Sequence, residues 1–256
     1  MEPWKTALSD STENHIRIRG QEMTSLMAKA SFTEVVFLLH QGRSPSEEER
    51  RLLDAILIAV SDHGPGSPSA ATSRLVASAN RQAPEAAVAA GVLAIGDMHA
   101  GAGLACMHVI EAGLELARRE SISIDEAARR TVDDFIQRKA RLPGFGHRVH
   151  SRDPRTDVLF GLARESKLAG DGIAFVTAIE VAARQKIKPL PINVDGALAA
   201  VLHDLGFPPL FGKLVFIIGR VAGLTAQVME EYTRERPMRI KIPVIYDGLP
   251  PQDHGA

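Results

Sequence analysis

The stretch Leu142-Pro-Gly-Phe-Gly-His-Arg-Val-His-Ser-Arg-Asp-Pro-Arg155 lies between two helical segments, and the rest of the chain is organised around it. It holds two Gly, two Pro, two His and three Arg, more than a connection between helices needs. Gly lets a backbone come close to a ligand, Arg binds carboxylates and phosphates, and His transfers protons near neutral pH. The composition predicts either a site for an anion or a Pro/Gly turn whose charges lie in water.

Helical patterns lie on both sides of this stretch. Ser31 with Glu34, and Ser46 followed by three Glu, are typical of helix starts, and apolar residues recur after them at helical spacing. Patterns of this kind predict helices at residues 31–42, 46–61, 67–79, 84–95, 104–118, 125–141, 157–165, 172–185, from 195 onward and at 212–232. No βαβ alternation is present, so we predict an all-α fold, a single module over residues 1–256.

The remaining segments give weaker signals. Residues 1–14 are polar and predict a loose arm, and residues 15–20 alternate like a short strand, which predicts a small hairpin or an extended entry segment. Residues 84–95 are apolar on every face, which predicts a buried helix. The tail, residues 237–256, is rich in Pro and is predicted to be extended.

The composition argues against several classes of protein. Lys and Arg total 30 against 31 for Asp and Glu, so no nucleic acid partner is indicated. No stretch approaches the roughly 20 uninterrupted apolar residues of a membrane span, and the N-terminus lacks the order of a signal peptide. Cys106 is the only cysteine, which rules out an internal disulfide framework and favours a reducing compartment. We therefore expect a soluble, cytoplasmic protein.

The histidines do not form a recognisable metal set. No Cys-x-x-Cys pair exists, and no two of the nine His stand four residues apart on a helix. His99 and His108 lie near Gly101-Ala-Gly103, which is a weak signal for a phosphate or metal site, and helix packing through small residues explains the same pattern. We predict that no metal is bound.

Three titratable side chains are harder to explain by packing. His63 and His147 lie among Gly residues at helix or loop ends, and Asp195 lies at the start of a helix in an apolar neighbourhood. Two imidazoles and a carboxylate with a raised pKa can divide proton transfer and charge stabilisation between them. The alternatives are a plain helix N-cap for Asp195 and a helix C-terminal charge partner for His63.

Arg220 lies in the middle of an apolar helix, where a guanidinium removed from water needs a partner. That partner is either an internal Asp or Glu or a carboxylate of a substrate. The sequence pattern does not choose between the two.

These residues lie in segments that resemble the citrate synthase superfamily. The segments occur in the order and spacing of that superfamily: Ser61-Asp-His-Gly-Pro-Gly66, Pro143-Gly-Phe-Gly-His-Arg-Val149 with Asp153-Pro-Arg155, Asn193-Val-Asp-Gly196, and Gly219-Arg220. Ile18-Arg-Gly20 and Ser31-Phe-Thr-Glu-Val35 also match its N-terminal pattern. The resemblance spans roughly residues 15–240, and the four segments together are specific where each alone is weak.

The resemblance implies a role for each matching residue. His63, His147 and Asp195 look like the family's catalytic triad. Carboxylates of oxaloacetate or citrate would be bound by Arg155 and Arg220, with Arg148 as a helper, and by Arg236 reaching into the site of a neighbouring subunit. The expected coenzyme A contacts are Leu142, Gly144, Gly146, Lys188 and Asn193. The resemblance therefore implies a coenzyme A thioester as substrate and no permanent cofactor.

The chain departs from full-length synthases between the turn at residues 42–45 and His63. Synthases insert a long helical segment there that carries a further substrate-binding His, and we expect that contact to be missing. The sequence motifs around Asp62, Asp97 and Asn193 are closer to those of the citryl-CoA lyase module of ATP citrate lyase. The resemblance thus favours cleavage of citryl-CoA, or a related 3-hydroxy-3-carboxyacyl-CoA, to acetyl-CoA and oxaloacetate. Alternatives are a citrate or alkylcitrate synthase and a non-catalytic member that binds CoA esters.

The resemblance also implies an architecture. A large helical subdomain would comprise residues 15–65 and 190–256, and a smaller one residues 66–189. The active site would lie in the cleft between them, which closes on the substrate. A homodimer with shared active sites is expected, since relatives exchange contacts through the last helix and the tail.

Overall fold

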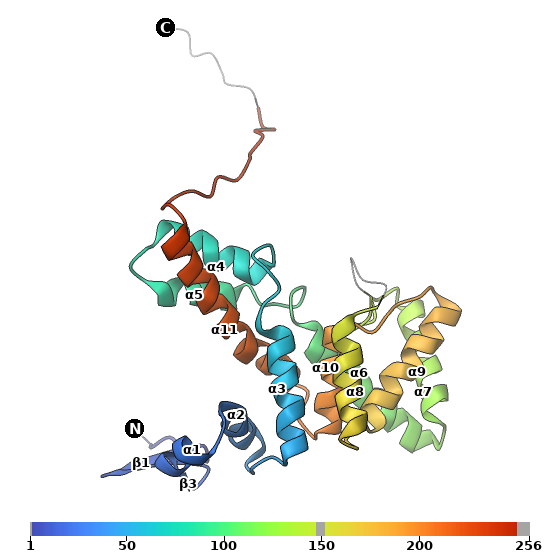
Figure 1. The fold of residues 1–256 in the computed structure, drawn as a ribbon. Helices are drawn as coiled ribbons and strands as arrows, with labels where there is room; N and C mark the ends of the chain where they lie inside the picture. Colours follow the sequence, from blue (N-terminus) through green and yellow to red (C-terminus); the bar gives the residue numbers. More distant parts are fainter. Residues whose placement is uncertain (1, 147–151, 250–256) are drawn as a thin grey trace.

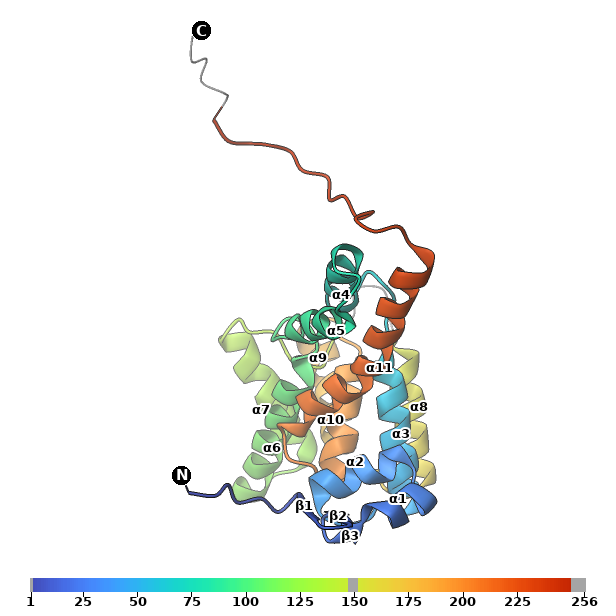
Figure 2. The ribbon, with the colours of Figure 1, turned by 90° about the vertical axis from the view of Figure 1, so that its left-hand side faces the viewer.

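The computed structural model describes residues 2–146 and 152–249, and within them it confirms the all-α prediction (Figures 1 and 2). The helices are α1 (Met23–Lys29), α2 (Phe32–Gln41), α3 (Glu47–Ser61), α4 (Pro68–Ala79), α5 (Pro84–Leu93), α6 (Ala102–Glu120), α7 (Ile124–Gln137), α8 (Pro154–Glu165), α9 (Asp171–Lys186), α10 (Val194–Asp204) and α11 (Phe211–Arg234). The predicted helix starts at Ser31 and Ser46 are confirmed, since each serine forms a capping box with the Glu three residues later.

The N-terminal segment contains more structure than the sequence predicted. Strands β1 (Ser9–Thr12), β2 (His15–Ile18) and β3 (Gln21–Glu22) form an antiparallel sheet in that order, so part of the predicted loose arm is a strand. Helix α1 was not predicted at all. It has no buried residue and no side-chain cap, and therefore carries neither of the signals by which the other helices were recognised.

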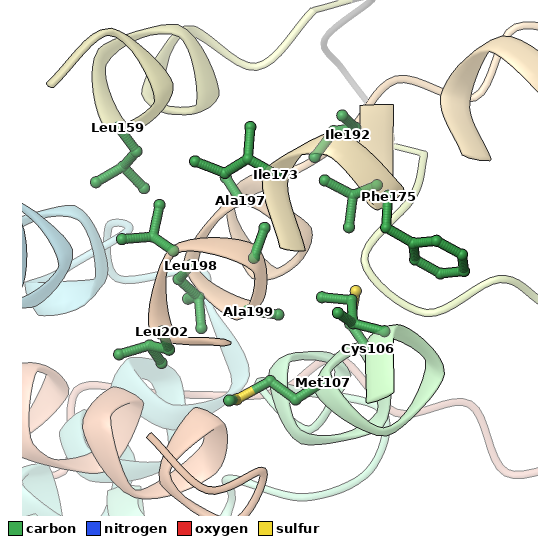
Figure 3. Packing of buried hydrophobic residues seen from close by; sticks show 14 of the residues in the cluster. Cys106, Met107, Leu159, Ile173, Phe175, Ile192, Ala197, Leu198, Ala199 and Leu202 are labelled. Carbon is green, nitrogen blue, oxygen red and sulfur yellow. The ribbon is translucent and has the colours of Figure 1, made fainter. Parts of the chain in front are cut away.

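Helix α10 lies at the centre of the main core. Every residue from Gly196 to Leu202 is buried, and α10 packs against α6, α8 and α9. Figure 3 shows Ala197, Leu198 and Leu202 among side chains of these neighbouring helices. Small and apolar residues on all faces allow a helix to be enclosed in this way. The first turn of α10 is thereby fixed in the interior, and it carries Asp195.

Helix α11 packs along α3, α4, α5 and α6. A side chain at Gly223 would collide with the carbonyl oxygen of Ser61, at 2.0 Å from the added Cβ, so glycine lets α11 touch the end of α3. By length and composition alone α11 could cross a membrane, but it buries Arg220 and Glu231 against its neighbours. It is the core helix of this half of the molecule.

The prediction that residues 84–95 form a helix buried on all sides is wrong. In α5 only Ala87 and Gly91 are buried, and Leu93 is 85% exposed. The helix packs on α4 and α11 through one face and leaves its opposite apolar face open. Apolar residues around a whole helix do not reveal how many faces its neighbours cover.

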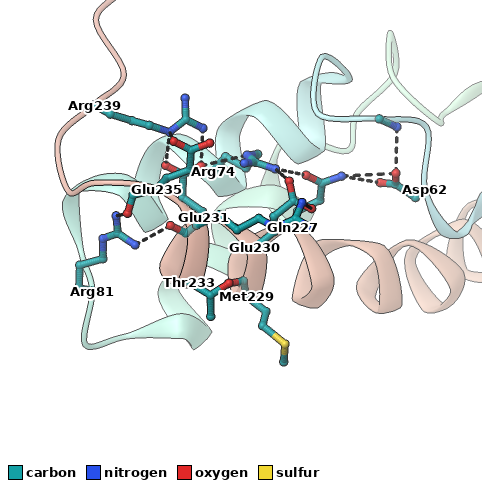
Figure 4. A network of polar contacts seen from close by, with 12 residues as sticks. Asp62, Arg74, Arg81, Gln227, Met229, Glu230, Glu231, Thr233, Glu235 and Arg239 are labelled. Carbon is teal, nitrogen blue, oxygen red and sulfur yellow. Dashed lines mark hydrogen bonds and ion pairs between the residues drawn. The ribbon is translucent and has the colours of Figure 1, made fainter.

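A buried ionic network fixes the end of α11 and the start of the tail (Figure 4). Glu231 is fully buried and accepts hydrogen bonds from Arg74 of α4, at 3.0 Å, and from Arg239 of the tail, at 2.6 and 3.0 Å. Arg74 also donates to Gln227, whose amide contacts Asp62 beside His63. Beyond this anchor the tail runs away from the body of the molecule (Figure 1).

Helices α6, α8 and α9 pack on α10, α7 packs on α6 and α9, and α4 and α5 pack on α11. Helix α3 contacts both α8 and α11. The division into a large subdomain of residues 15–65 and 190–256 and a small one of residues 66–189 stays a prediction.

Candidate active site

Three helices and the segments that adjoin helices bring polar side chains to one small cavity of about 160 Å³. It is lined by His63, His99, Ala100, Arg155, Asn193, Val194, Asp195, Phe216 and Arg220. His63 follows α3, and His99 and Ala100 precede α6. Arg155 lies in α8, Val194 and Asp195 lie in α10 directly after Asn193, and Phe216 and Arg220 lie in α11. The structure thus brings His63, Asp195, Arg155 and Arg220, predicted separately from the sequence, to a common cavity.

Asp195 is the carboxylate of this cavity. Its Oδ1 is buried, and among the residues that the structure describes no donor reaches that atom. Burial, the largest cause, raises the pKa of Asp195 from 3.8 to about 6, although the positive charge of Arg155 acts in the opposite direction. A carboxyl group held in this way can carry a proton near neutral pH and release it to a substrate.

The alternative of a plain N-cap for Asp195 is wrong, because the N-cap of α10 is Asn193. The Oδ1 of Asn193 accepts hydrogen bonds from the backbone N–H groups of Asp195 and Gly196, at 3.0 and 3.2 Å. Capping by Asn193 leaves the side chain of Asp195 available to the cavity.

Arg220 is 2% exposed and donates only to uncharged oxygens: Nε to the carbonyl of Val60, at 2.9 Å, and Nη1 to Oγ of Ser69, at 3.0 Å. Its guanidinium lies 4.7 Å from the centre of the Phe216 ring. No carboxylate of the described chain lies within the 4.0 Å of an ion pair. Burial accordingly lowers the pKa of Arg220. A buried cation without a carboxylate partner favours binding of an anion in the cavity.

Arg155, in contrast, already has a carboxylate partner. Its Nε and Nη2 donate to the two oxygens of Asp153, at 3.0 and 2.8 Å, and Nη1 lies 3.5 Å from the carbonyl of Ala59. The side chain remains about a quarter exposed, at 27%, and lines the cavity. The pair presents a guanidinium in a fixed orientation to whatever the cavity holds.

Among the described residues, two imidazoles line the cavity, and the sequence pattern had pointed strongly to only one of them. His63 is exposed, two residues beyond the end of α3. His99 is half-buried, and its Nε2 lies 3.0 Å from Oγ of Ser69 and 3.4 Å from the backbone N of Ser69. Burial, then the charges of Arg220 and His63, lower the pKa of His99. The lowered pKa favours the neutral form of His99.

His99 was predicted only as a weak phosphate or metal candidate, and the structure places it in the cavity. The available sequence signal was the break in helical pattern at Gly96-Asp-Met-His-Ala-Gly101. In the structure Ala100, which follows His99, has a left-handed φ of 67°. A non-glycine residue in that conformation is often found at functional sites.

The predicted coenzyme A contacts lie where two loops meet. Gly146 N donates to Pro191 O, at 2.7 Å, Asn193 N to Gly144 O, at 3.1 Å, and Asn193 Nδ2 to Gly146 O, at 2.9 Å. Leu142 is buried and Lys188 is exposed. Of these residues only Asn193 lines the cavity, and its side chain is engaged in capping and loop closure. Contact with coenzyme A stays a prediction for all of them.

The remaining predicted residues are two that the structure does not describe and one that lies away from the cavity. His147 and Arg148 lie outside the described residues. Arg236 is exposed at the start of the tail and does not line the cavity. His108 lies on α6, also away from the cavity, beside Glu111.

A larger cavity, about 600 Å³, lies between α7, α8 and α9. Its lining mixes small and apolar residues with polar ones, and the charged groups in it are Asp125, Arg129 and Arg164. The size of a cavity therefore does not identify the site. The site is identified by Asp195, whose Oδ1 has no donor among the described residues, and by Arg220, which has no carboxylate partner there. Among the described residues, no cluster of three or more His, Cys, Asp or Glu side chains is placed to hold a metal ion.

Comparison with solved structures gives a match over the whole chain. The citryl-CoA lyase from Hydrogenobacter thermophilus is 36% identical, with a TM-score of 0.89, and the match covers 98% of this chain and 97% of that one. An ATP citrate lyase from Methanosaeta concilii is 20% identical, with a TM-score of 0.78, over 99% of this chain and 43% of that one. The second match shows the shared fold.

The curated relatives are synthases. A citrate synthase from Heyndrickxia coagulans is 28% identical over 90% of this chain, and a 2-methylcitrate synthase from Shewanella oneidensis is 29% identical over 79%. The matched parts make up 60% and 52% of those proteins, so the chain spans little more than half of their length. The family description "Citrate synthase, C-terminal domain" matches residues 40–241. The chain therefore belongs to the citrate synthase family.

Proposed function

We propose that the protein is a citryl-CoA lyase, cleaving citryl-CoA or a related 3-hydroxy-3-carboxyacyl-CoA to acetyl-CoA and oxaloacetate. The observation that carries this proposal is the buried, unpartnered carboxyl of Asp195 in the same cavity as Arg155 and Arg220. A proton donor beside two guanidinium groups suits a reaction that protonates a carbon atom while carboxylates are held in place. The 36% identity to a citryl-CoA lyase of nearly the same length supports cleavage.

Cleavage of the carbon–carbon bond needs two proton transfers, one on each side of the bond that breaks. His147 accepts the proton of the tertiary hydroxyl, whose oxygen becomes the ketone of oxaloacetate as the carbon–carbon bond breaks. The bonding electrons pass to the thioester, which becomes the enolate of acetyl-CoA. Protonated Asp195 then gives its proton to the enolate carbon, which becomes the methyl group.

The enolate oxygen needs a hydrogen-bond donor, and two imidazoles are candidates. His63 is the candidate from the sequence resemblance. His99 has the stronger structural support: the backbone N–H of Ser69 points at Nε2, so Nε2 is the acceptor and Nδ1 carries the proton. A neutral imidazole whose tautomer is fixed in this way is a preorganised donor for a developing oxyanion.

Single substitutions separate the two imidazoles. Loss of the donor to the enolate oxygen should lower kcat on the order of a hundredfold or more, whereas loss of a residue that only binds the carboxylates should mainly raise KM. Comparing His99→Ala with His63→Ala assigns the roles. A large fall in kcat for His63→Ala alone would show that His63, and not His99, is the donor to the enolate oxygen.

A citrate or alkylcitrate synthase is the second candidate, because the curated relatives are synthases. The two activities differ in thioester hydrolysis. The enzyme is mixed with citryl-CoA, and separately with acetyl-CoA and oxaloacetate, and free thiol and oxaloacetate are followed. A lyase forms acetyl-CoA and oxaloacetate from the first mixture without releasing thiol. Rapid thiol release from the second mixture alone would overturn the lyase proposal.

We further propose that the protein acts as a homodimer with shared active sites. The exposed apolar face of α5 and the exposed apolar residues of the tail offer a surface for a second copy. If Arg236 serves the neighbouring cavity, mixing Arg236→Ala with Asp195→Asn subunits gives mixed dimers with one intact site each. About a quarter of the wild-type activity should return, by the statistics of random pairing. No recovery on mixing, with mixed dimers verified by mass, would exclude sharing through Arg236.

A further inference from the structure

Asp153 is a buried carboxylate with no role in the cavity described so far. It is 1% exposed, is the N-cap of α8, and is not among the residues that line the cavity. Removing a carboxylate from water is costly unless several donors bind it. Its donors therefore indicate what it holds in place.

The contacts of Asp153 exceed those of a helix cap. Its Oδ1 accepts from the backbone N of Arg155, at 3.1 Å, which is the capping contact, and from Nε of Arg155, at 3.0 Å. Its Oδ2 accepts from Nη2 of Arg155, at 2.8 Å, and from the backbone N of Val194, at 3.0 Å. Three of the four bonds thus go to the guanidinium and to the first residue of α10.

These bonds connect two helices that each supply a cavity residue. Arg155 lies in the first turn of α8, and Val194 precedes Asp195 in the first turn of α10. Oγ1 of Thr156 donates to the carbonyl of Ile192, at 3.0 Å, and gives a second tie between the same two helix starts. Of the described residues, however, Asp153 alone hydrogen-bonds both the Arg155 side chain and the α10 backbone.

We propose that Asp153 is the positioning residue that holds the Arg155 guanidinium and the first turn of α10 in a fixed relation, so that Arg155 and Asp195 act on the same bound substrate. The inference rests on the proposed function for the identity of that substrate. The bidentate pair fixes the Arg155 fork, and the bond to Val194 fixes the backbone from which Asp195 extends.

The charge of Asp153 also acts on Asp195. It raises the pKa of Asp195, whereas Arg155 and Arg220 lower it. In the part of the chain that the structure describes, the other titratable groups beside Asp195 are His63 and His99 in the cavity and the buried thiol of Cys106. Replacing Asp153 by a neutral side chain removes one negative charge and releases Arg155 from its partner. Both changes lower the pKa of Asp195.

Binding of oxaloacetate, measured by calorimetry, is the first test. Asp153→Asn should weaken binding about tenfold or more, because the Arg155 guanidinium loses its bidentate partner. Asp153→Ser, which keeps the capping contact, is expected to do the same while folding normally. The matched control is Asp204→Asn, another buried carboxylate that caps a helix, which should bind like wild type. In an Arg155→Ala background, Asp153→Asn should add less than a twofold loss.

The second test needs no ligand. The pKa of the Asp195 carboxyl is followed by carbon NMR, with its signal assigned by its absence in Asp195→Asn. It should fall in Asp153→Asn and stay unchanged in Asp204→Asn. An unchanged pKa in folded Asp153→Asn, or unchanged oxaloacetate binding, would overturn the positioning role. If wild type itself does not bind oxaloacetate, the proposed function fails, and the NMR result still decides the role of Asp153.

Discussion

The two ends of α10 each carry a carboxylate in a protein interior, and they are treated in opposite ways. At the N-terminal end, Oδ1 of Asp195 is buried without a donor among the described residues. At the C-terminal end, the Asp204 side chain is 3% exposed and accepts from the backbone N of Gly170, Gly172 and Ile173, at 2.7, 2.7 and 3.2 Å. Asp204 thereby caps α9, which has no side-chain cap of its own.

The difference separates a carboxylate that stabilises the fold from one that is kept for chemistry. Three backbone donors satisfy the buried carboxylate of Asp204 and tie α10 to α9. Burial without a donor disfavours the charged form of Asp195 and makes it a proton carrier. The same contrast occurs on α11, where Glu231 has two arginine partners and Arg220 has no carboxylate partner in the described chain. Unpartnered buried charges mark the site.

The largest effect is expected at the N-terminal end. Asp195→Asn keeps the size of the side chain but removes the transferable proton, so turnover should fall by a hundredfold or more. The measurement is the initial rate with citryl-CoA, together with the melting temperature, which should not fall. Wild-type turnover in this variant would end the catalytic assignment and with it the contrast between the two carboxylates.

The C-terminal end should respond in the opposite way. Asp204→Ala leaves the first backbone N–H groups of α9 without their acceptor, and we expect a loss of about 2 to 3 kcal/mol in the free energy of unfolding. The activity of the folded fraction should be retained. Urea denaturation followed by circular dichroism gives the stability, with rates measured in the absence of denaturant. A fall in kcat without a fall in stability would mean that the two ends are not separate in function.

Much of the fold was predictable because local signals decided it. The capping boxes at Ser31 and Ser46 and the apolar spacing after them require no tertiary information. The burial of α5 was not predictable, since Leu93 and Ala87 are both apolar and only the position of α4 and α11 decides which of them is covered. Helix α1 was missed because it buries nothing.

Site residues were predictable where a charged residue interrupts an apolar stretch of sequence. Arg220 in an apolar helix and Asp195 in an apolar neighbourhood both line the cavity. His99 was missed as a catalytic candidate because a lone His beside Gly residues is also typical of helix packing. Only the fold shows its contact with Ser69. The contact between Asp153 and Val194 joins residues 41 apart, and no local pattern encodes it.

The smallest expected effect is on the dependence of stability on pH. It tests the difference between the carboxylates of Asp195 and Asp204 most directly. The pKa of Asp195 in the folded protein, about 6, lies above its ordinary value of 3.8. The folded state therefore binds the proton more tightly than the unfolded state, so this group stabilises the protein at low pH and that contribution is lost as the pH rises through about 6. Linkage gives a loss of about 1 kcal/mol between pH 5 and pH 7.

Asn cannot titrate, so the Asp195→Asn variant lacks this loss. Its free energy of unfolding relative to wild type should increase by about 1 kcal/mol from pH 5 to pH 7, as measured by urea denaturation at both pH values. Shifts at His99 and His40 occur in both proteins and cancel in the difference. A difference that is constant with pH would mean that Asp195 is not held protonated by its burial. In that case a hydrogen-bond donor reaches its carboxylate, as backbone donors reach that of Asp204, and the two ends of α10 are alike.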